Sequence, residues 1–318
     1  MKEESPFFFD IERFYNAKFK YPLERESLEN YLSGTAFGRS QEYSVKEQND
    51  LYADIRDIYN NVISGLNIKS PPSKRFAVIT AGAPGSGKTT VLRQHLKENI
   101  SKGMNYAYVC HDDVCLRNLR RTFQKDIESC DQSTASRRAI YNKWKPASHG
   151  ACHLILQNLI EDKCNFYFGT TSARPFAKFF LEFLKAQEYH IKLLHVTAPD
   201  DVRWESVQER NKTFIHAAEP QVKEDGFLLP QQMNQVFLAY ADEIEFYYRK
   251  GVEEKAKLAA TWTRNISSLE PLGTLRIILP NEYAEIKKNH NAVIKTLNRP
   301  DLDWENSLEK RANIFDCF

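Results

Sequence analysis

A glycine-rich turn in the first third of the chain has the residue types and spacing of a phosphate-binding loop. The stretch "AVITAGAPGSGKTTVL" begins as an apolar, β-branched strand and continues as a helix, and Gly82 to Thr89 fit the pattern G-x-x-x-x-G-K-[ST] between them. Glycines let main-chain N–H groups turn inward around phosphate oxygens, and the helix directs the positive end of its dipole at the same anion. Lys88 is predicted to reach the β- and γ-phosphates, and the Thr89 hydroxyl to complete a Mg²⁺ shell. The residues expected to bind a nucleoside triphosphate are Gly82, Ala83, Pro84, Gly85, Ser86, Gly87, Lys88, Thr89 and Thr90.

Two acids, Asp112 and Asp113, follow the next predicted strand in "YVCHDDVCLR". Ligands of open α/β sheets collect at the carboxyl ends of the strands. An aspartate at such a position can hold the water shell of Mg²⁺, or it can accept the proton of a hydroxyl that is being phosphorylated. The alternative is that the two carboxylates only cap the following helix.

Two later segments carry candidate substrate-binding residues. Thr170 and Thr171 follow the third predicted strand, in "FGTTSARP", where they either position a substrate oxygen or serve only as turn residues. Arg203 and Arg210 lie seven residues apart in "APDDVRWESVQERNKTF", hence on one helix face. A guanidinium there would stabilise charge on a transferring phosphoryl group, whereas the alternative is a pair of solvated charges.

These segments belong to a predicted alternation of strands and helices. Strands are expected at "FAVITAG", "YAYVC", "NFYFG" and "IKLLHV", with helical patterns between them. This alternation predicts the α/β class, with a parallel sheet of the phosphate-loop NTPase and kinase type flanked by helices. One helical stripe indicates packing rather than a ligand site, and its members are Phe176, Phe179, Phe180, Phe183 and Leu184.

A helical segment is expected before this alternation. Its apolar residues recur at helical spacing, and they are Leu51, Ile55, Ile58, Val62 and Leu66. The prolines of "SPPSKR" cannot continue a helix. The sequence therefore predicts a helical N-terminal segment over residues 1–72 and a phosphate-loop domain over residues 73–318.

Composition narrows the choice of partners and compartment. The 318 residues carry a net charge of +2, which argues against a broad nucleic-acid or membrane footprint. No apolar run is long enough to cross a bilayer, and the acidic start "MKEESPFFFD" is not a secretory signal. The six cysteines show no zinc-type spacing. We expect a cytoplasmic protein without nucleic-acid or membrane partners; export to a host cell by another route would leave no trace here.

The ordered set of motifs resembles the zeta-toxin family of phosphate-loop kinases. The resemblance rests on "GAPGSGKT", on "HDDVCLR", on the strand ending in "NFYFGTT", on the arginine of "QERN" and on the late segment "ADEIEFYYRKGV". It spans residues 74 to 260. It implies an ATP-dependent kinase that uses Mg²⁺, acts as a toxin or effector, and is covered by a separate antitoxin or inhibitor protein.

Carried over position by position, the resemblance assigns roles to residues of this chain. Lys88 and Thr89 keep their phosphate and Mg²⁺ roles. Asp113 resembles the catalytic base, with Asp112 as the alternative because the following basic residue, Arg117, is offset by one position. Arg210 resembles the arginine that contacts the transferred phosphate.

The chain departs from the family pattern at two places. The family has a glutamate before the G-T that contacts a nucleotide-sugar, where this chain has Phe168 or Gly169, and a second lid arginine where it offers Lys223. Family members phosphorylate UDP-N-acetylglucosamine, and some related effectors phosphorylate NAD on a ribose hydroxyl. A small nucleotide-like acceptor of either kind is therefore expected. Two other functions stay open. One is a nucleotide-dependent switch that binds a protein, although no switch-loop signature such as D-x-x-G follows the phosphate loop. The other is a protein kinase that uses the same site.

Overall fold

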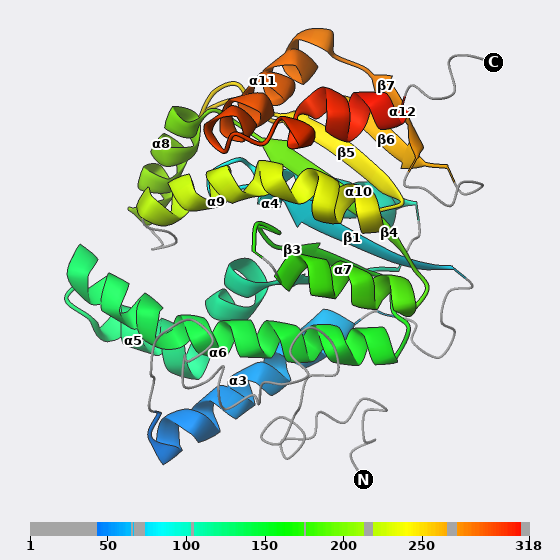
Figure 1. Ribbon diagram of the computed structural model, residues 1–318. Coiled ribbons are helices and arrows are strands. Elements are labelled where there is room, and N and C mark those ends of the chain that lie inside the picture. The colour runs from blue at the N-terminus through cyan, green and yellow to red at the C-terminus, as the bar shows by residue number, and fades with distance from the viewer. Residues whose placement is uncertain are drawn as a thin grey trace. The chain divides into compact units, whose positions relative to one another are not determined.

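The chain forms two compact units in the computed structural model (Figure 1). One unit combines Met1–Pro72 with Asn105–Cys164, and the other combines Ser73–Met104 with Asn165–Phe318. The structure describes residues 43–64, 66, 74–102, 105–174, 176–212, 219–265 and 272–312. Most of the N-terminal segment expected over residues 1–72 therefore lies outside the described residues. None of the helices within these ranges is long and apolar enough to span a membrane.

The first unit is largely helical. Its elements are α3 (Val45–Ile63), β2 (Ala107–Cys110), the short helical turns η2 (His111–Cys115), η3 (Leu116–Asn118) and η4 (Arg120–Gln124), α5 (Lys125–Ser129) and α6 (Thr134–Glu161). Helix α3 begins at a reciprocal cap, because the Ser44 hydroxyl accepts from the Glu47 N–H and the Ser44 N–H donates to the Glu47 carboxylate. The predicted apolar face is confirmed at Leu51, Ile55 and Ile58, which are buried. Val62 is only half-buried, and Leu66 lies beyond the end of α3.

One buried carboxylate joins the N-terminal helix to the middle of the chain. Asp54 on α3 accepts hydrogen bonds from the Arg121 N–H and guanidinium and from the Thr122 hydroxyl, all at 3.0 Å. These donors compensate for the burial of the carboxylate, which is fully buried. The contact explains why α3 belongs to the same compact unit as residues 105–164.

The second unit contains the phosphate loop and most of the strands. Its elements are β1 (Arg75–Ala81), α4 (Lys88–Ser101), β3 (Phe166–Gly169), α7 (Phe176–Ala186), β4 (Tyr189–Thr197), α8 (Asp200–Asn211), α9 (Glu219–Gln232), η5 (Met233–Phe237), α10 (Leu238–Tyr240), β5 (Glu243–Tyr248), β6 (Lys257–Arg264), β7 (Gly273–Ile277), α11 (Pro280–Thr296), η6 (Pro300–Leu302), η7 (Glu305–Glu309) and α12 (Lys310–Ala312).

The strands of this unit lie in the order β3-β1-β4-β5-β6-β7. The first four are parallel: Ala77 of β1 pairs with Phe166 on one side and Ile191 on the other, and β5 continues beside β4. The predicted α/β class with a parallel sheet flanked by helices is confirmed. Strands β6 and β7 add an antiparallel edge that the sequence did not indicate. The parallel pairing places the carboxyl ends of β1, β3, β4 and β5 at one edge, where ligands of such sheets bind.

Helices of the second unit cover the sheet (Figure 1). Helix α4 contacts β1, β3 and β4, α7 contacts β4, and α11 contacts β5 and β6. The aromatic stripe on α7 packs as predicted at Phe180 and Leu184, which are buried, but Phe179 is 53% exposed. The buried positions of α7 repeat at three and four residues from Ala177, and residue 179 falls outside that face.

Candidate functional site

The phosphate loop lies between β1 and α4 in the second unit, as predicted. Gly85 and Gly87 have φ of 82° and 96°, in the left-handed region that favours glycine. A Cβ on Gly85 would collide with the Arg203 carbonyl, so this position also requires glycine for space. The loop passes directly into the helix, because the Thr90 and Val91 N–H groups donate to the Gly87 carbonyl at 3.1 and 3.2 Å.

The side chains of the loop are arranged around its concave main chain. Lys88 Nζ donates to the Ala83 carbonyl at 3.0 Å, so the ammonium group lies back over the loop. The Ser86 hydroxyl is buried and has no hydrogen-bond partner within the described parts of the chain. Thr89 is half-buried and Thr90 exposed in the first turn of α4. A buried hydroxyl without a partner, an ammonium group and a helix N-terminus together suit a phosphate group.

The turn after β3 is tied to the start of the phosphate loop. The Thr80 hydroxyl donates to the Thr170 carbonyl at 2.6 Å and accepts from the Thr170 N–H at 2.9 Å. The Gly82 N–H donates to the Thr171 carbonyl at 2.9 Å, and the Ser172 hydroxyl donates to the Thr80 carbonyl at 2.8 Å. The main chain of Thr170 and Thr171 is thus part of the loop's framework, and both side chains are half-buried.

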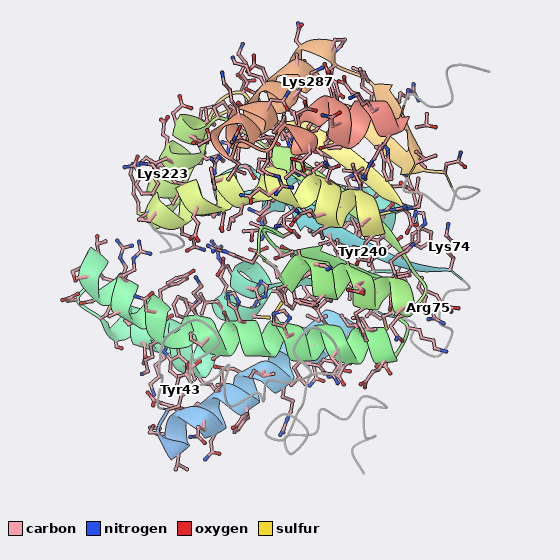
Figure 2. The ribbon with its side chains drawn as sticks, in the orientation of Figure 1. Tyr43, Lys74, Arg75, Lys223, Tyr240 and Lys287 are labelled. Atoms are coloured by element: carbon pink, nitrogen blue, oxygen red, sulfur yellow. The ribbon has the colours of Figure 1, made fainter. Side chains whose placement is uncertain are left out.

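The two arginines of α8 differ in burial. Arg203 is 4% exposed, and its guanidinium pairs with Asp200 and donates to the Val222 carbonyl of α9 at 2.8 Å. Its side chain therefore joins α8 to α9. Arg210, in the last turn of α8, is half-buried. Lys223 is exposed on α9 (Figure 2).

A third arginine, Arg249, contacts the phosphate loop and was not identified from the sequence. It follows β5, and its Nη1 donates to the Gly85 carbonyl and to the Ser206 hydroxyl, both at 3.0 Å. The same guanidinium donates to the carbonyls of Glu254 and Val252. Burial lowers the pKa of Arg249. The segment "ADEIEFYYRKGV" contained this arginine, but its spacing carried no sign of a contact with residue 85.

A carboxylate of α9 was also missed. Asp225 is 1% exposed and its Oδ1 lies 3.0 Å from Arg174 Nη2, in an ion pair. Burial raises the pKa of the Asp225 carboxyl, while the charges of Arg174 and Lys88 lower it. An acid on a polar stretch of helix gives no sequence signal that it will be buried beside an arginine from another part of the chain.

The acidic pair belongs to the first unit. Asp112 and Asp113 lie in η2, directly after β2, and both are half-buried. The Tyr108 hydroxyl donates to Asp113 Oδ2 at 2.8 Å, which orients this carboxylate. The neighbouring His111 stacks on His149 with ring centroids 4.1 Å apart, and burial lowers the pKa of His111 to about 4. His111 is therefore neutral near pH 7.

Other predicted residues occupy different environments. Arg117 is exposed in η3, near the acidic pair in sequence. Phe168 is fully buried and packs its ring 5.4 Å from that of Phe180 in α7. In the described ranges no group of three or more His, Cys, Asp or Glu side chains could hold a metal ion. Thr89 offers one hydroxyl ligand of the kind that a Mg²⁺ bound to nucleotide phosphates and water accepts.

Comparisons with known proteins agree with this geometry. The family model of Zeta toxin matches residues 61–253, more than half of the chain. No curated protein matches the sequence.

The native AvrRxo1-ORF1:-ORF2 complex is similar in structure, with a TM-score of 0.54, 10% identity, and coverage of 85% of this chain and 86% of that one. The AvrRxo1-ORF1:AvrRxo1-ORF2 structure with sulphate ions has a TM-score of 0.50, 10% identity, and coverage of 86% and 91%. A structure from the PezAT chromosomal toxin-antitoxin system of Streptococcus pneumoniae has a TM-score of 0.48, 16% identity, and coverage of 66% and 80%. The fold and the matched residues lead to one assignment: the chain belongs to the zeta toxin family and is an ATP-dependent kinase.

Proposed function

We propose that this kinase transfers the γ-phosphate of Mg²⁺·ATP to a hydroxyl of a small nucleotide-like acceptor. The observation that carries the proposal is the phosphate loop with Lys88 over its concave side and a buried hydroxyl, Ser86, still without a hydrogen-bond partner in the described ranges. Residues 82 to 90 would bind the triphosphate. The Thr89 hydroxyl would hold Mg²⁺, which would neutralise negative charge on the phosphates when bound.

Asp113 is the proposed base, with Asp112 as the alternative. Asp113 would take the proton of the acceptor hydroxyl while that oxygen forms its bond to the γ-phosphorus and the bond to the β-phosphate oxygen breaks, releasing ADP. The Tyr108 hydroxyl supports this choice, because its hydrogen bond to Asp113 Oδ2 orients the carboxylate. Lys88 and Arg210 would stabilise the phosphoryl group in transfer.

The acceptor would be bound by residues at the strand ends. Thr170, Thr171 and Arg117 are the proposed contacts. Arg203 would act indirectly, by joining α8 to α9, because its guanidinium is already paired. The buried ring of Phe168 offers no carboxylate for a sugar hydroxyl. This favours an NAD-like acceptor over UDP-N-acetylglucosamine.

Incubation with γ-labelled ATP and each acceptor, and in parallel with a cell extract, tests the proposal. We expect label in NAD or UDP-N-acetylglucosamine, with a product heavier by one phosphoryl group in mass spectrometry. An Asp113→Asn variant should bind ATP and transfer nothing. Label that appears only in inorganic phosphate would favour the switch, and label in the macromolecular fraction would favour a protein kinase.

A toxin or effector role is proposed from the family. One similar structure is a complex of two proteins, AvrRxo1-ORF1 and -ORF2, and we propose that an antitoxin or inhibitor protein likewise binds this kinase. Its substrates would be cytoplasmic metabolites, either of the producing cell or of a host. The active and Asp113→Asn forms are expressed in separate cultures and growth is measured. Growth inhibition by the active form alone indicates toxicity by catalysis, and inhibition by both forms indicates toxicity by binding.

A further inference from the structure

The turn that carries Arg174 is fixed to the phosphate loop. Four hydrogen bonds link Thr80 and Gly82 to residues 170–172. Ser172 has φ of 53°, an unusual value for a side chain other than glycine, and it is buried. Arg174 follows two residues later, and its carbonyl accepts from the Ala177 N–H at the start of α7. Arg174 therefore follows, by two residues, a turn whose main chain is hydrogen-bonded to the first residues of the loop.

The guanidinium of Arg174 is bound by two acids of α9. Its Nη1 and Nη2 donate to the two carboxylate oxygens of Glu224 at 2.7 and 2.8 Å, and Nη2 lies 3.0 Å from Asp225 Oδ1. The side chains of Arg174 and Glu224 are 44% and 55% exposed, so this bidentate pair can exchange partners with a solute. A bidentate carboxylate presents the same pair of oxygens that a phosphate would present.

A single residue, Arg203, contacts both the phosphate loop and helix α9. The Arg203 carbonyl leaves no room for a Cβ on Gly85, and the Arg203 guanidinium leaves none on Gly226 of α9. Arg203 thus separates the loop from the residue next to Asp225. Burial raises the pKa of Asp225, and the charges of Arg174 and Lys88 reduce this rise.

We propose that Arg174 is a further phosphate-binding residue of this kinase, which the carboxylates of Glu224 and Asp225 hold in the nucleotide-free protein and which turns to the triphosphate when ATP binds. The proposal rests on ATP binding by the loop. Glu224 competes with the γ-phosphate for the same guanidinium, so removing the charge of Glu224 favours ATP.

Four variants of the full chain, titrated with ATP and ADP in the presence of Mg²⁺, test this. Arg174→Gln should weaken ATP binding about tenfold and ADP binding much less, because the lost contact is to the terminal phosphate. Glu224→Gln should tighten ATP binding several-fold. The double variant should behave like Arg174→Gln alone, because the competition exists only through Arg174.

Arg299→Gln is the matched control. Arg299 forms an exposed bidentate pair with Asp301 between α11 and η6, and its replacement should leave both affinities unchanged. Equal ATP affinity in Arg174→Gln and Arg299→Gln would overturn the proposal, as would a Glu224→Gln protein that binds ATP no more tightly than wild type. Wild-type protein that binds no ATP would instead overturn the proposed function itself.

Discussion

Arg249 Nη1 donates to the main-chain carbonyl of Gly85 at 3.0 Å, which ties the end of β5 to the centre of the phosphate loop. Three more oxygens, of Ser206, Glu254 and Val252, accept from the same guanidinium. The planar, five-donor shape of arginine suits such a set of acceptors. The loop therefore depends on a residue far outside its own motif.

Replacing Arg249 by Ala should loosen the loop. Carbonyl groups that now accept from a charged donor would lose it, at a cost of about 2 kcal/mol in the free energy of unfolding. ATP affinity should fall about tenfold, because the Gly85 carbonyl would no longer be held. Urea unfolding and calorimetric titration with ATP measure the two effects.

The control is Arg249→Lys, which keeps the charge but has a compact ammonium group in place of the fork. It should recover only part of the ATP affinity. An Arg249→Ala protein with wild-type stability and ATP affinity would show that the contact with Gly85 does nothing for the loop.

Thr80→Val should separate the turn after β3 from the loop. Thr80 is fully buried, and its hydroxyl serves both the carbonyl and the N–H of Thr170. Valine fills the same volume and leaves both groups without that partner, which should lower the free energy of unfolding by about 1–3 kcal/mol. Thr80→Ser keeps the hydroxyl and should lose less. Equal thermal midpoints for the Val and Ser variants would argue against this hydrogen-bonded link.

Asp113→Asn should abolish transfer and spare ATP binding. A general base contributes about 10²–10⁴-fold to a rate, so kcat should fall by at least about a hundredfold, to or below the detection limit, while the Kd for ATP stays unchanged. Asp112→Asn is the matched control, one residue away in the same turn, and should retain most of its activity. A reversed result would assign the base to Asp112, and normal turnover by both variants would exclude the acidic pair from the chemistry.

The second unit should lose stability in acid through two glutamates of β5. Burial raises the pKa of Glu245, but hydrogen bonding from His95 and the nearby charge of Lys192 outweigh it and bring the pKa to about 2. The hydrogen bond from His190 and the charge of Lys192 lower the pKa of Glu243 to about 2 against the effect of burial. Both values lie below the ordinary 4.5, so the stabilisation is complete above pH 4.5 and is lost as the pH falls toward 2.

Urea midpoints measured between pH 7 and pH 2 check this expectation. Glu245→Gln removes one of the two titrating groups and should flatten the pH dependence between about pH 4.5 and 2. A Glu245→Gln protein whose midpoint depends on pH as steeply as that of wild type would contradict the assignment.

The parts of the fold that depend on local sequence were predictable. The phosphate loop is a contiguous motif, so its glycines, Lys88 and the following helix could be identified without the fold. The alternation of apolar strands with helices likewise predicted a parallel sheet. The β6–β7 edge was not predicted because these strands are antiparallel, so they do not continue the alternation of strands and helices that indicates a parallel sheet.

The long-range contacts of the site were not predictable. Arg249 and Gly85 are 164 positions apart, and nothing in either segment indicates the other. The spacing of Arg203 and Arg210 placed them on one face of a helix, but not which of them is buried against another helix. In the sequence Asp225 is one of several charged residues in a polar stretch. Its carboxylate is buried only because α9 packs against the rest of the second unit.

Titration of wild type and Lys88→Ala with ATP, with and without Mg²⁺, shows whether the phosphate loop binds nucleotide through this lysine. We expect saturable, Mg²⁺-dependent binding by wild type and a loss of at least about a hundredfold in affinity when the ammonium group over the loop is removed. Wild-type protein that fails to bind ATP at millimolar Mg²⁺, or a Lys88→Ala variant that binds it equally well, would contradict this expectation.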